Sequence, residues 1–456
     1  MLDNLAERFE MLRVITQLAI AAAVSCLVIV EPAAAAEEDF RERVVSERLV
    51  ARITNITKEA RESFTVSPDQ RRIAYATVVG GLFGRKMSVV VDGKEIGQYD
   101  NILANTLLFS PDSQRFGFGA LRDGKRLVVV DGKEEITGHE RLGAGSFVFS
   151  PDSKRLAYST GTVDKKWSVI VDGRSGKQYD GVGSHNIRFS PQSERLAYVA
   201  ADGGRWFVVI DGQEGKRHDG ILDHSLVFNP DGKTVAYIAK VANKQLAVIG
   251  EQHYGPYDRV DEIVFSQDGK RFGFVAFDSG APLIVIDGKE HARHERIYAG
   301  SLAFNPDGRR VAYGAYSKGK SVVVVDGSEG TGYAQLAGSI VFSPDGRRMA
   351  YQGVNEGGGS RWWYVIVDGK ELGPYDGLNH MSFSPNGDHF AYAARIGGSW
   401  SVVLDGKEGI SHHGLVRGGR ILFDSPNQFH YFAAKRDGEV FEFYLVEEKI
   451  VRRGER

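Results

Sequence analysis

The chain repeats one stretch, which is most complete in residues 149–189: Phe149-Ser150-Pro151-Asp152, then Arg155-Leu156-Ala157-Tyr158, then Trp167-Ser168-Val169-Ile170-Val171-Asp172-Gly173, then Gln178-Tyr179-Asp180-Gly181, before the next copy begins at Phe189-Ser190-Pro191. A repeat near forty residues determines the architecture before any single motif does, because each copy folds as one unit that stacks on its neighbours.

Ten copies follow one another in phase. The proline of the Ser-Pro-Asp turn stands at Pro68, Pro111, Pro151, Pro191, Pro230, Pro306, Pro344, Pro385 and Pro426, and Gln267 replaces it once. Successive positions are 37 to 43 residues apart. An Asp-Gly pair recurs in the same phase at Asp92, Asp131, Asp172, Asp211, Asp287, Asp326, Asp368 and Asp405.

Each copy predicts four short antiparallel strands, named a to d here. Strand a ends in Phe-Ser-Pro, and Pro-Asp-Gly makes a tight turn into strand b, which has the pattern Arg-x-Ala-Tyr. A polar loop leads to the valine-rich strand c, and Asp-Gly closes a hairpin to strand d. Such units are typical of propeller blades, so we expect an all-β chain: a β-propeller of ten four-stranded blades over residues 63–456.

The repeat resembles the WD40-like Pro-Asp repeat of TolB-type propellers. Pro344-Asp345-Gly346-Arg347-Arg348-Met349-Ala350-Tyr351 is a close match, and the resemblance covers residues 64 to about 446. Gln192, Gln267, Asn386 and Asn427 depart from the pattern at turn positions. The resemblance implies an extracytoplasmic binding or scaffolding propeller, but it does not name the partner.

The ten copies fit either one wide ring or two five-bladed rings, since single propellers usually have four to eight blades. No linker separates the copies, which favours one ring. Residues 37–62 are expected to hold an N-terminal helix and the closing strand. Apolar residues at helical spacing indicate a short helix over 37–50, and the β-rich residues 49–56 predict the outer strand of the closing blade.

Residues 1–36 have the features of a signal peptide. Arg8 and Arg13 precede an apolar run from Val14 to Val30, and Ala33 to Ala36 offer a cleavage site. The alternative is an uncleaved segment that anchors the protein, although the run is short for a spanning helix. Both interpretations predict export, and cleavage predicts a periplasmic or secreted protein.

Charge and cysteine content exclude several classes of function. After residue 36 the chain carries 55 basic and 55 acidic residues, which gives no support to a nucleic-acid partner. Cys26 is the only cysteine, so neither a disulfide framework nor a thiolate metal site is expected in the repeats.

Variable loops point to one face for binding. In a four-stranded blade the a–b and c–d turns lie on one face and the b–c and d–a loops on the other, and variable loops on a rigid scaffold commonly bind ligands. The b–c loops are rich in basic residues, and all five tryptophans lie where these loops enter strand c. The predicted binding residues are Arg122, Lys125, Lys165, Lys166, Trp167, Arg205, Trp206, Arg361, Trp362, Trp363, Arg395 and Trp400. Such a face suits a protein, an anionic glycan or an acidic peptide; alternatively, the tryptophans pack between blades and the basic groups are solvated.

Catalytic motifs are missing from the sequence. There is no nucleophile elbow, phosphate loop, zinc helix motif or dinucleotide fingerprint, so we predict no enzyme and no cofactor. The Asp-Gly turns offer one carboxylate each, too few for calcium. His139, His218 and His412 replace the tyrosine of Tyr-Asp, which indicates a structural position. The expected function is an exported scaffold that binds a protein in the cell envelope; the alternative is a propeller that binds glycans or processes polysaccharide through its b–c and d–a loops.

Overall fold

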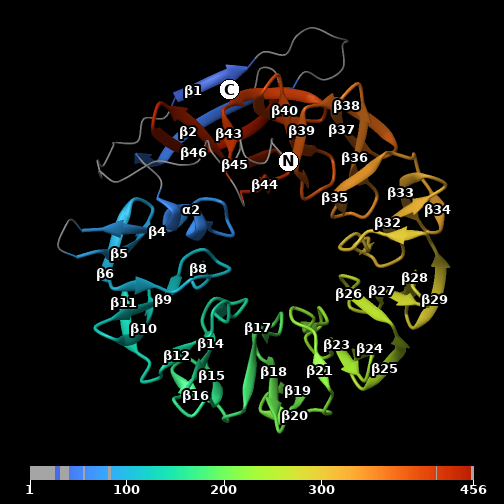
Figure 1. The fold of residues 1–456 in the computed structure, drawn as a ribbon. Coiled ribbons are helices and arrows are strands. Elements are labelled where there is room, and N and C mark those ends of the chain that lie inside the picture. Colours follow the sequence, from blue (N-terminus) through green and yellow to red (C-terminus); the bar gives the residue numbers. More distant parts are fainter. Residues whose placement is uncertain (1–25, 31–40, 55–56, 81–83, 417–418, 453–456) are drawn as a thin grey trace. The chain divides into compact units, whose positions relative to one another are not determined.

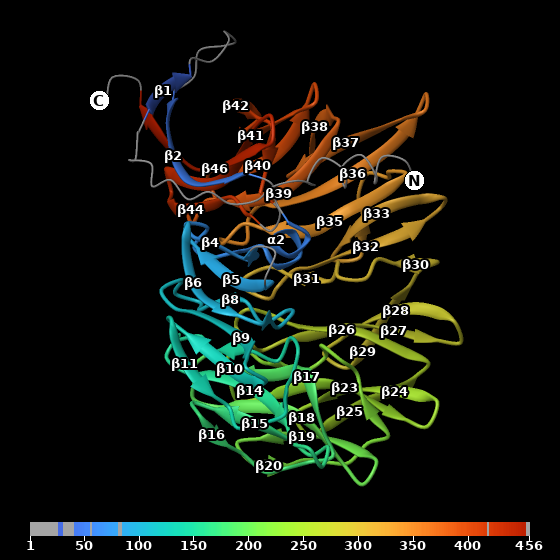
Figure 2. The same ribbon diagram turned by 60° about the vertical axis from the view of Figure 1, so that its left-hand side comes forward.

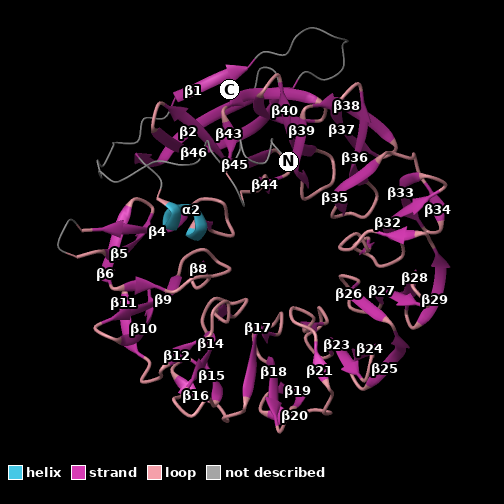
Figure 3. Cartoon of the chain, in the orientation of Figure 1, coloured by secondary structure: helices cyan, strands magenta, loops and turns pink. Residues whose placement is uncertain are grey.

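The computed structural model describes residues 26–30, 41–54, 57–80, 84–416 and 419–452. Almost all of them lie in strands or in the turns between strands, and α2 (Lys58–Ser63) is the one helix among them (Figure 3). Within these ranges no helix is long and apolar enough to cross a membrane. The predicted signal peptide lies outside the described residues except for residues 26–30, which form β1.

The chain divides into two compact units, residues 1–136 with 375–456, and residues 137–374. Unit 1 holds the first two and the last two blades (Figure 1). In order a to d, blade 1 has β3 (Thr65–Val66), β4 (Ile73–Val79), β5 (Lys86–Val91) and β6 (Lys94–Tyr99), and blade 2 has β7 (Asn101–Ile102) with β8 (Leu108–Phe109), β9 (Phe116–Arg122), β10 (Lys125–Val130) and β11 (Lys133–Ile136). Blade 9 has β39 (Gly377–Phe383), β40 (Phe390–Ile396), β41 (Ser399–Leu404) and β42 (Lys407–His412). Blade 10 has β43 (Gly414–Leu415) with β44 (Leu422–Ser425), β45 (Gln428–Asp437), β46 (Val440–Arg452) and β2 (Arg41–Thr54), and β1 (Cys26–Val30) adds to its edge.

Unit 2 holds blades 3 to 8 (Figure 2). Blade 3 has β12 (Arg141–Leu142) with β13 (Val148–Phe149), β14 (Leu156–Gly161), β15 (Trp167–Val171) and β16 (Arg174–Ser175), and blade 4 has β17 (Gly181–Phe189), β18 (Leu196–Asp202), β19 (Arg205–Ile210) and β20 (Gln213–Glu214). Blade 5 has β21 (Gly220–Ile221) with β22 (Val227–Phe228), β23 (Val235–Val241), β24 (Lys244–Ile249) and β25 (Gln252–Tyr257), and blade 6 has β26 (Arg259–Phe265), β27 (Phe272–Asp278), β28 (Ala281–Ile286) and β29 (Lys289–Arg293). Blade 7 has β30 (Arg296–Ile297) with β31 (Ala303–Phe304), β32 (Val311–Ser317), β33 (Lys320–Val325) and β34 (Ser328–Glu329), and blade 8 has β35 (Gln335–Phe342), β36 (Met349–Gly357), β37 (Ser360–Val367) and β38 (Lys370–Tyr375).

The two middle strands of each blade form its core. Strands β4 and β5 of blade 1 are buried along nearly their whole length, whereas the outer strand β6 is mostly exposed. A strand that neighbouring sheets cover on both faces reads as a continuous apolar run, which explains the Ala-Tyr and Val-Val-Val segments. In unit 2, for example, Val169 of blade 3 shares one core cluster with Tyr198 and Phe207 of blade 4.

The Pro-Asp and Asp-Gly turns are connected to each other within a blade. In blade 3 the Ser150 hydroxyl donates to Asp152 at 2.5 Å and accepts the Arg155 N–H at 2.9 Å. Asp172 has φ +50° and accepts from the Leu156 N–H and from the Arg155 guanidinium, at 3.0 and 3.2 Å. The charged residues that recur in these turns therefore connect strand b to strands a and c.

The same arginine position also connects successive blades. In unit 2 one Nη of Arg195 donates to the carbonyl of Lys233 in the next blade at 2.8 Å, and Arg271 donates to the carbonyl of Gly308 at 2.8 Å. In unit 1 Arg72 reaches the Ser113 carbonyl in the same manner, at 2.8 Å. These bonds hold each Pro-Asp turn against the blade before it.

The N-terminal strand completes the last blade. β2 pairs antiparallel with β46 from Arg41↔Arg452 to Thr54↔Val440, so the prediction of a closing outer strand is confirmed for residues 49–54. The helix expected over residues 37–50 is wrong for residues 41–50, which are part of β2. Arg43, Val45, Ala51 and Ile53 are buried on alternate positions, a period of two that only a strand produces.

The last blade packs directly on the first one. Ile53 and Phe443 of blade 10 share a core cluster with Ile73 and Tyr75 of blade 1, and Phe64 lies 5.4 Å from Phe443 between ring centroids. Two separate five-bladed rings would instead close copy 1 on copy 5, so that alternative is wrong. The fold is a single all-β propeller of ten four-stranded blades, as the repeats predict.

Candidate functional site

Several predicted binding residues of the b–c loops instead hold neighbouring blades together. Lys166 donates to Asp180 at 2.6 Å, and the other oxygen of Asp180 accepts the Gly203 N–H of the next b–c turn at 2.8 Å. Arg205 pairs with Asp219 in the same way, and Asp219 accepts the Ala242 N–H at 2.6 Å. The Lys166 ammonium, aided by that N–H, holds the pKa of Asp180 below its ordinary value. Lys166 and Arg205 are therefore parts of inter-blade clamps.

Arg122 is also committed to a neighbouring side chain. Its guanidinium donates two bonds to Glu134, at 2.6 and 2.8 Å, and lies 4.6 Å from the centroid of Tyr99 in blade 1. Tyr99 in turn donates to Glu134 at 2.9 Å. A bidentate pair stacked on an aromatic ring has little freedom to rearrange around a ligand.

Four of the five tryptophans pack on the sheets, partly buried. A Cβ on Gly161 would lie 3.1 Å from the Trp167 ring, so this indole rests on the glycine of strand b. Trp206 packs against the core between blades 4 and 5, Trp400 packs in the core of unit 1, and Trp363 is partly buried. Trp362 differs from the others because 39% of it is exposed.

The remaining predicted basic residues lie in or next to the b–c turns. Lys125 begins strand c of blade 2, and Lys165 has φ +61° in the b–c turn of blade 3. Arg361 pairs with Glu356 at 2.9 Å across the turn of blade 8, an exposed ion pair. Arg395 donates weakly to the Gly398 carbonyl at 3.4 Å. Four of the seven predicted basic residues, Arg122, Lys166, Arg205 and Arg361, are thus paired with carboxylates of the chain itself.

The histidines that replace tyrosine in strand d have a structural role. His218 contacts the Tyr237 hydroxyl of the next blade at 3.1 Å, and their rings meet edge to face. His412 contacts Tyr431 in the same way at 3.3 Å. Burial lowers the pKa of His218, and burial also lowers that of His412, to about 4. Both imidazoles are therefore neutral at pH 7.

A histidine cluster that the sequence interpretation missed lies along strand a of blades 4 and 5 in unit 2. His185 Nδ1 is 2.7 Å from an Asp223 carboxylate oxygen, and the same oxygen is 3.9 Å from His224 Nε2. The two imidazole rings stack with centroids 4.3 Å apart. This is the one group of three such side chains in the described ranges whose ligand atoms all lie within 4.8 Å of one another.

The cluster could have been found from the repeat. Gly145-Ser146 and Gly300-Ser301 mark the d–a turn in other copies, with the glycine at φ +69° and +72°. His224-Ser225 occupies the same place, and His224 keeps the turn conformation at φ +59°. A side chain with a Cβ at a position that favours glycine is a signal for a special role.

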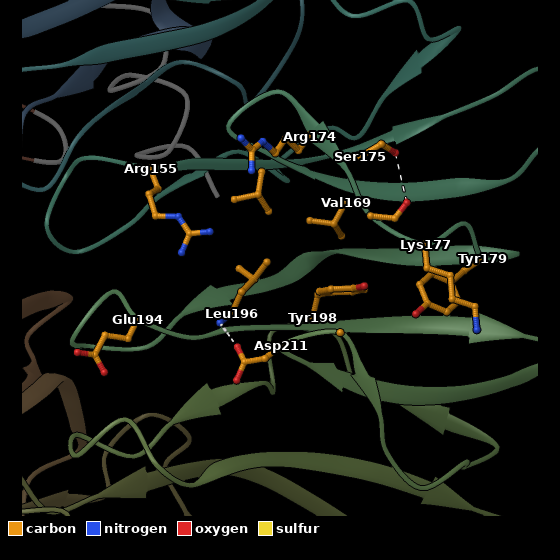
Figure 4. A pocket seen from close by; sticks show the side chains of 13 residues that line it. Arg155, Val169, Arg174, Ser175, Lys177, Tyr179, Glu194, Leu196, Tyr198 and Asp211 are labelled. Carbon is orange, nitrogen blue, oxygen red and sulfur yellow. Dashed lines mark hydrogen bonds between the residues drawn. The ribbon is translucent and has the colours of Figure 1, made fainter.

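A pocket lies between blades 3 and 4 (Figure 4). It has a volume of about 310 Å³ and opens where strand d of blade 3 is only two residues long. Its charged groups mostly serve the scaffold: Arg155 pairs with Asp172, Asp211 with Arg195, and Lys177 with Glu214. This pocket is a gap between blade rims, without a set of groups converging on one point.

Comparisons with known proteins find similar solved structures but no matching family. No protein-family model matches the chain, and no curated protein does. Among solved structures, a eukaryotic initiation factor is 13% identical, with 73% of this chain and 96% of that chain covered and a TM-score of 0.43. TolB from Acinetobacter baumannii is 18% identical, with 64% and 76% covered and a TM-score of 0.27. A β-propeller domain from Myceliophteria thermophila is 11% identical, with 65% and 94% covered and a TM-score of 0.28. Its strand pairing makes the chain a ten-bladed β-propeller, and a TolB protein is among the solved structures to which it is similar.

Proposed function

We propose that this propeller is an exported scaffold that binds a protein partner through the b–c turns of unit 2. One observation carries the proposal. Val163, Val241 and Trp362 are 74%, 42% and 39% exposed, and they are three of the four large hydrophobic side chains that stand out in this way among the described residues. All three lie at b–c turns, on blades 3, 5 and 8.

Exposed apolar side chains at turn tips support binding of a protein better than binding of a charged polymer. A solvated turn gains nothing from valine or tryptophan, and such side chains on a rigid scaffold commonly serve as interface anchors. The basic groups next to them, Lys165 and Arg361, fit the polar rim of such an interface. An acidic or mixed protein surface is the partner that this combination favours.

Affinity capture with single-face variants tests the binding proposal. The bait is the exported form, as wild type, as Val163→Asp/Val241→Asp/Trp362→Ala, and as the control Arg309→Glu/Arg347→Glu. The control residues lie on the a–b turns at the opposite face of unit 2, and their side chains are exposed as well. We expect the wild type and the control to retain the same partner and the b–c variant to lose it. Equal capture by all three would contradict the proposal.

Export rests on the N-terminal sequence and needs a separate test. Residues 1–36 fused to a reporter that is active only outside the cytoplasm should give an active reporter, and N-terminal sequencing of the mature protein should begin after residue 36. An inactive reporter would contradict export. A mature protein that still contains residues 1–36 would instead indicate an anchor in the membrane.

A binding role agrees better with the d–a loops than a catalytic one. Polysaccharide hydrolysis needs two carboxyl groups facing a common substrate. The d–a carboxylates Asp223 and Glu262 are each held by protein groups: Asp223 by His185 and Asn186, and Glu262 by the Leu302 N–H at 3.4 Å. Binding of an anionic glycan remains measurable in the same capture format, with immobilised glycan in place of a protein extract.

A further inference from the structure

We propose that His185, Asp223 and His224 form a binding site for a divalent transition-metal ion of the zinc class. His185 lies in β17, which is strand a of blade 4, and Asp223 and His224 lie between β21 and β22, the two parts of strand a of blade 5; β17 and β21 are labelled in Figure 1. It is independent of the protein-binding proposal, which rests on the b–c turns. Two imidazoles and one carboxylate are ligands that Zn²⁺ accepts readily.

The distances require only small movements. Ligand atoms on one tetrahedral zinc ion, each about 2.0–2.1 Å from the metal, are about 3.3 Å apart. His185 Nδ1 and the Asp223 oxygen are 2.7 Å apart, while that oxygen and His224 Nε2 are 3.9 Å apart. An ion entering between them would widen the first distance and shorten the second. The two rings stack 20° from parallel, so one ring must also rotate to point its nitrogen lone pair, which lies in the ring plane, at the ion. All three side chains are partly exposed, which allows this rotation.

The surroundings fix the carboxylate and leave room for the imidazole. The second oxygen of Asp223 accepts from the Asn186 amide at 3.3 Å, which orients the first oxygen toward the histidines. A Cβ on Gly145 would lie 2.7 Å from His185 Nε2, so the glycine of the preceding blade is what allows the ring to lie there. Supporting groups of this kind orient the ligands of natural metal sites.

Three protein ligands leave a coordination position open. In zinc proteins a closed four-ligand site is structural, whereas three ligands plus water form a site that can accept an outside group. Binding through His185 Nδ1 requires the tautomer that carries its hydrogen on Nε2, because a ring nitrogen that binds a metal cannot also carry a proton. With its three protein ligands, the proposed site binds Zn²⁺ together with a water or an external ligand in the fourth position.

Calorimetric titration with Zn²⁺, on untagged full-length protein stripped with a chelator, tests this inference. The variants are His185→Gln, Asp223→Asn and His224→Asn, and the control is His291→Gln, an exposed histidine of strand β29. His224→Asn is the most informative, because asparagine tolerates φ +59° and the second copy has Asn105 with φ +57° at the equivalent turn. We expect one Zn²⁺ per chain for the wild type and the control, and a loss of at least about tenfold in affinity for each site variant.

Two further measurements keep the outcome clear. Zn²⁺ should raise the melting temperature of the wild type and of His291→Gln but not that of His224→Asn, because an ion that binds only the folded state stabilises it. Substitution by Co²⁺ should give the visible absorption of a low-symmetry site with nitrogen ligands, and His224→Asn should abolish it. If the wild type binds no stoichiometric Zn²⁺, or if all three variants bind it as tightly as the wild type, the site does not exist.

Discussion

Replacing Arg43 by methionine should release the strand that completes the last blade. Arg43 lies in β2 and is 7% exposed, and its Nε donates to Glu448 at 2.6 Å. Its two Nη groups donate to the carbonyls of Lys407 and Val402 in blade 9, at 3.1 and 3.2 Å. One side chain thus connects the N-terminal strand, the C-terminal strand and the preceding blade of unit 1.

The size of the stability loss follows from the hydrogen-bond and charge partner that Glu448 would lose. Glu448 is 1% exposed, and without Arg43 its remaining donor is the Tyr431 hydroxyl at 2.9 Å. Breaking one partner of a buried ion pair costs about 3–5 kcal/mol, because the other charge stays buried. In Arg43→Met/Glu448→Gln no buried charge remains, and glutamine still offers an acceptor to Tyr431. The double variant should therefore recover most of the loss.

The stability loss of Arg43→Met should depend on pH in a defined direction. Burial raises the pKa of Glu448, and Arg43 acts against that rise. In Arg43→Met the opposing effect disappears, so the folded-state pKa rises further above the unfolded value. A raised folded pKa favours the protonated native state, so this stabilisation is complete at low pH and is lost as the pH rises through the folded pKa. The stability of Arg43→Met should therefore fall furthest below that of the wild type at neutral pH, and the difference should shrink on acidification.

Hydrogen exchange over residues 41–54 and 440–452 is the suitable assay, because it reports opening of this blade rather than unfolding of the whole chain. A loss of about 3–5 kcal/mol speeds exchange by about two to four orders of magnitude. Arg52→Met is the control, since Arg52 lies in the same strand but forms an exposed pair with Glu442 that is worth about 1 kcal/mol at most. If the single and double variants lost the same protection, Arg43 would act by packing and the argument from charge would be wrong.

Three further changes test the turns and the blade contacts. His412 has a pKa lowered to about 4 by burial, so native stability should fall by up to about 3 kcal/mol as the pH drops from about 6.5 to 4, and His412→Tyr should remove that loss in melting curves recorded across this range. Asp287 has φ +50° and accepts from the Phe272 N–H at 3.0 Å, so Asp287→Ala should cost about 1–2 kcal/mol in urea denaturation, whereas Asp287→Asn, which tolerates the same φ, should cost less than half as much; equal losses would contradict the turn argument. A Cβ on Gly353 would lie 2.6 Å from the Tyr333 ring, so Gly353→Ala should lower stability by about 1–3 kcal/mol, and an unchanged melting temperature would show that the ring can move aside.

Periodicity made the blades predictable, whereas contacts between distant residues were not. The Pro-Asp and Asp-Gly turns define strands through local bonds, such as those from Asp172 to strand b of the same blade. Residues 41–50 instead become a strand because β46 offers them a partner about 400 residues away, for example Val446 opposite Glu47. Their apolar spacing fits a short helix locally, and only the long-range pairing decides between the two.

The candidate site was predicted less well because charge at a turn has two uses. Lys166 and Arg205 stand at tips that face solvent, and nothing local distinguishes a ligand contact from a clamp. Their partners Asp180 and Asp219 lie fourteen positions later in each case, as Asp100 does from Lys86 and Asp258 from Lys244. A spacing that recurs with the repeat indicates a contact within the repeat, so this information was present in the sequence.

In a chain built of repeats, functional residues are expected where a side chain differs from the repeat and does not serve to join its blade to the next one. The recurring arginines, aspartates and tyrosines are occupied in joining blades, which is why abundant charge in this protein says little about its ligands. Val163 and Trp362 are apolar at tips where solvated residues would serve the fold equally well. His224 stands at the position of Gly145, Gly300 and Gly338 in three other copies. The two departures lie on different loops of unit 2, so a variant of either can be made without disturbing the other, and the binding of a protein and the binding of a metal ion can be measured separately on one molecule.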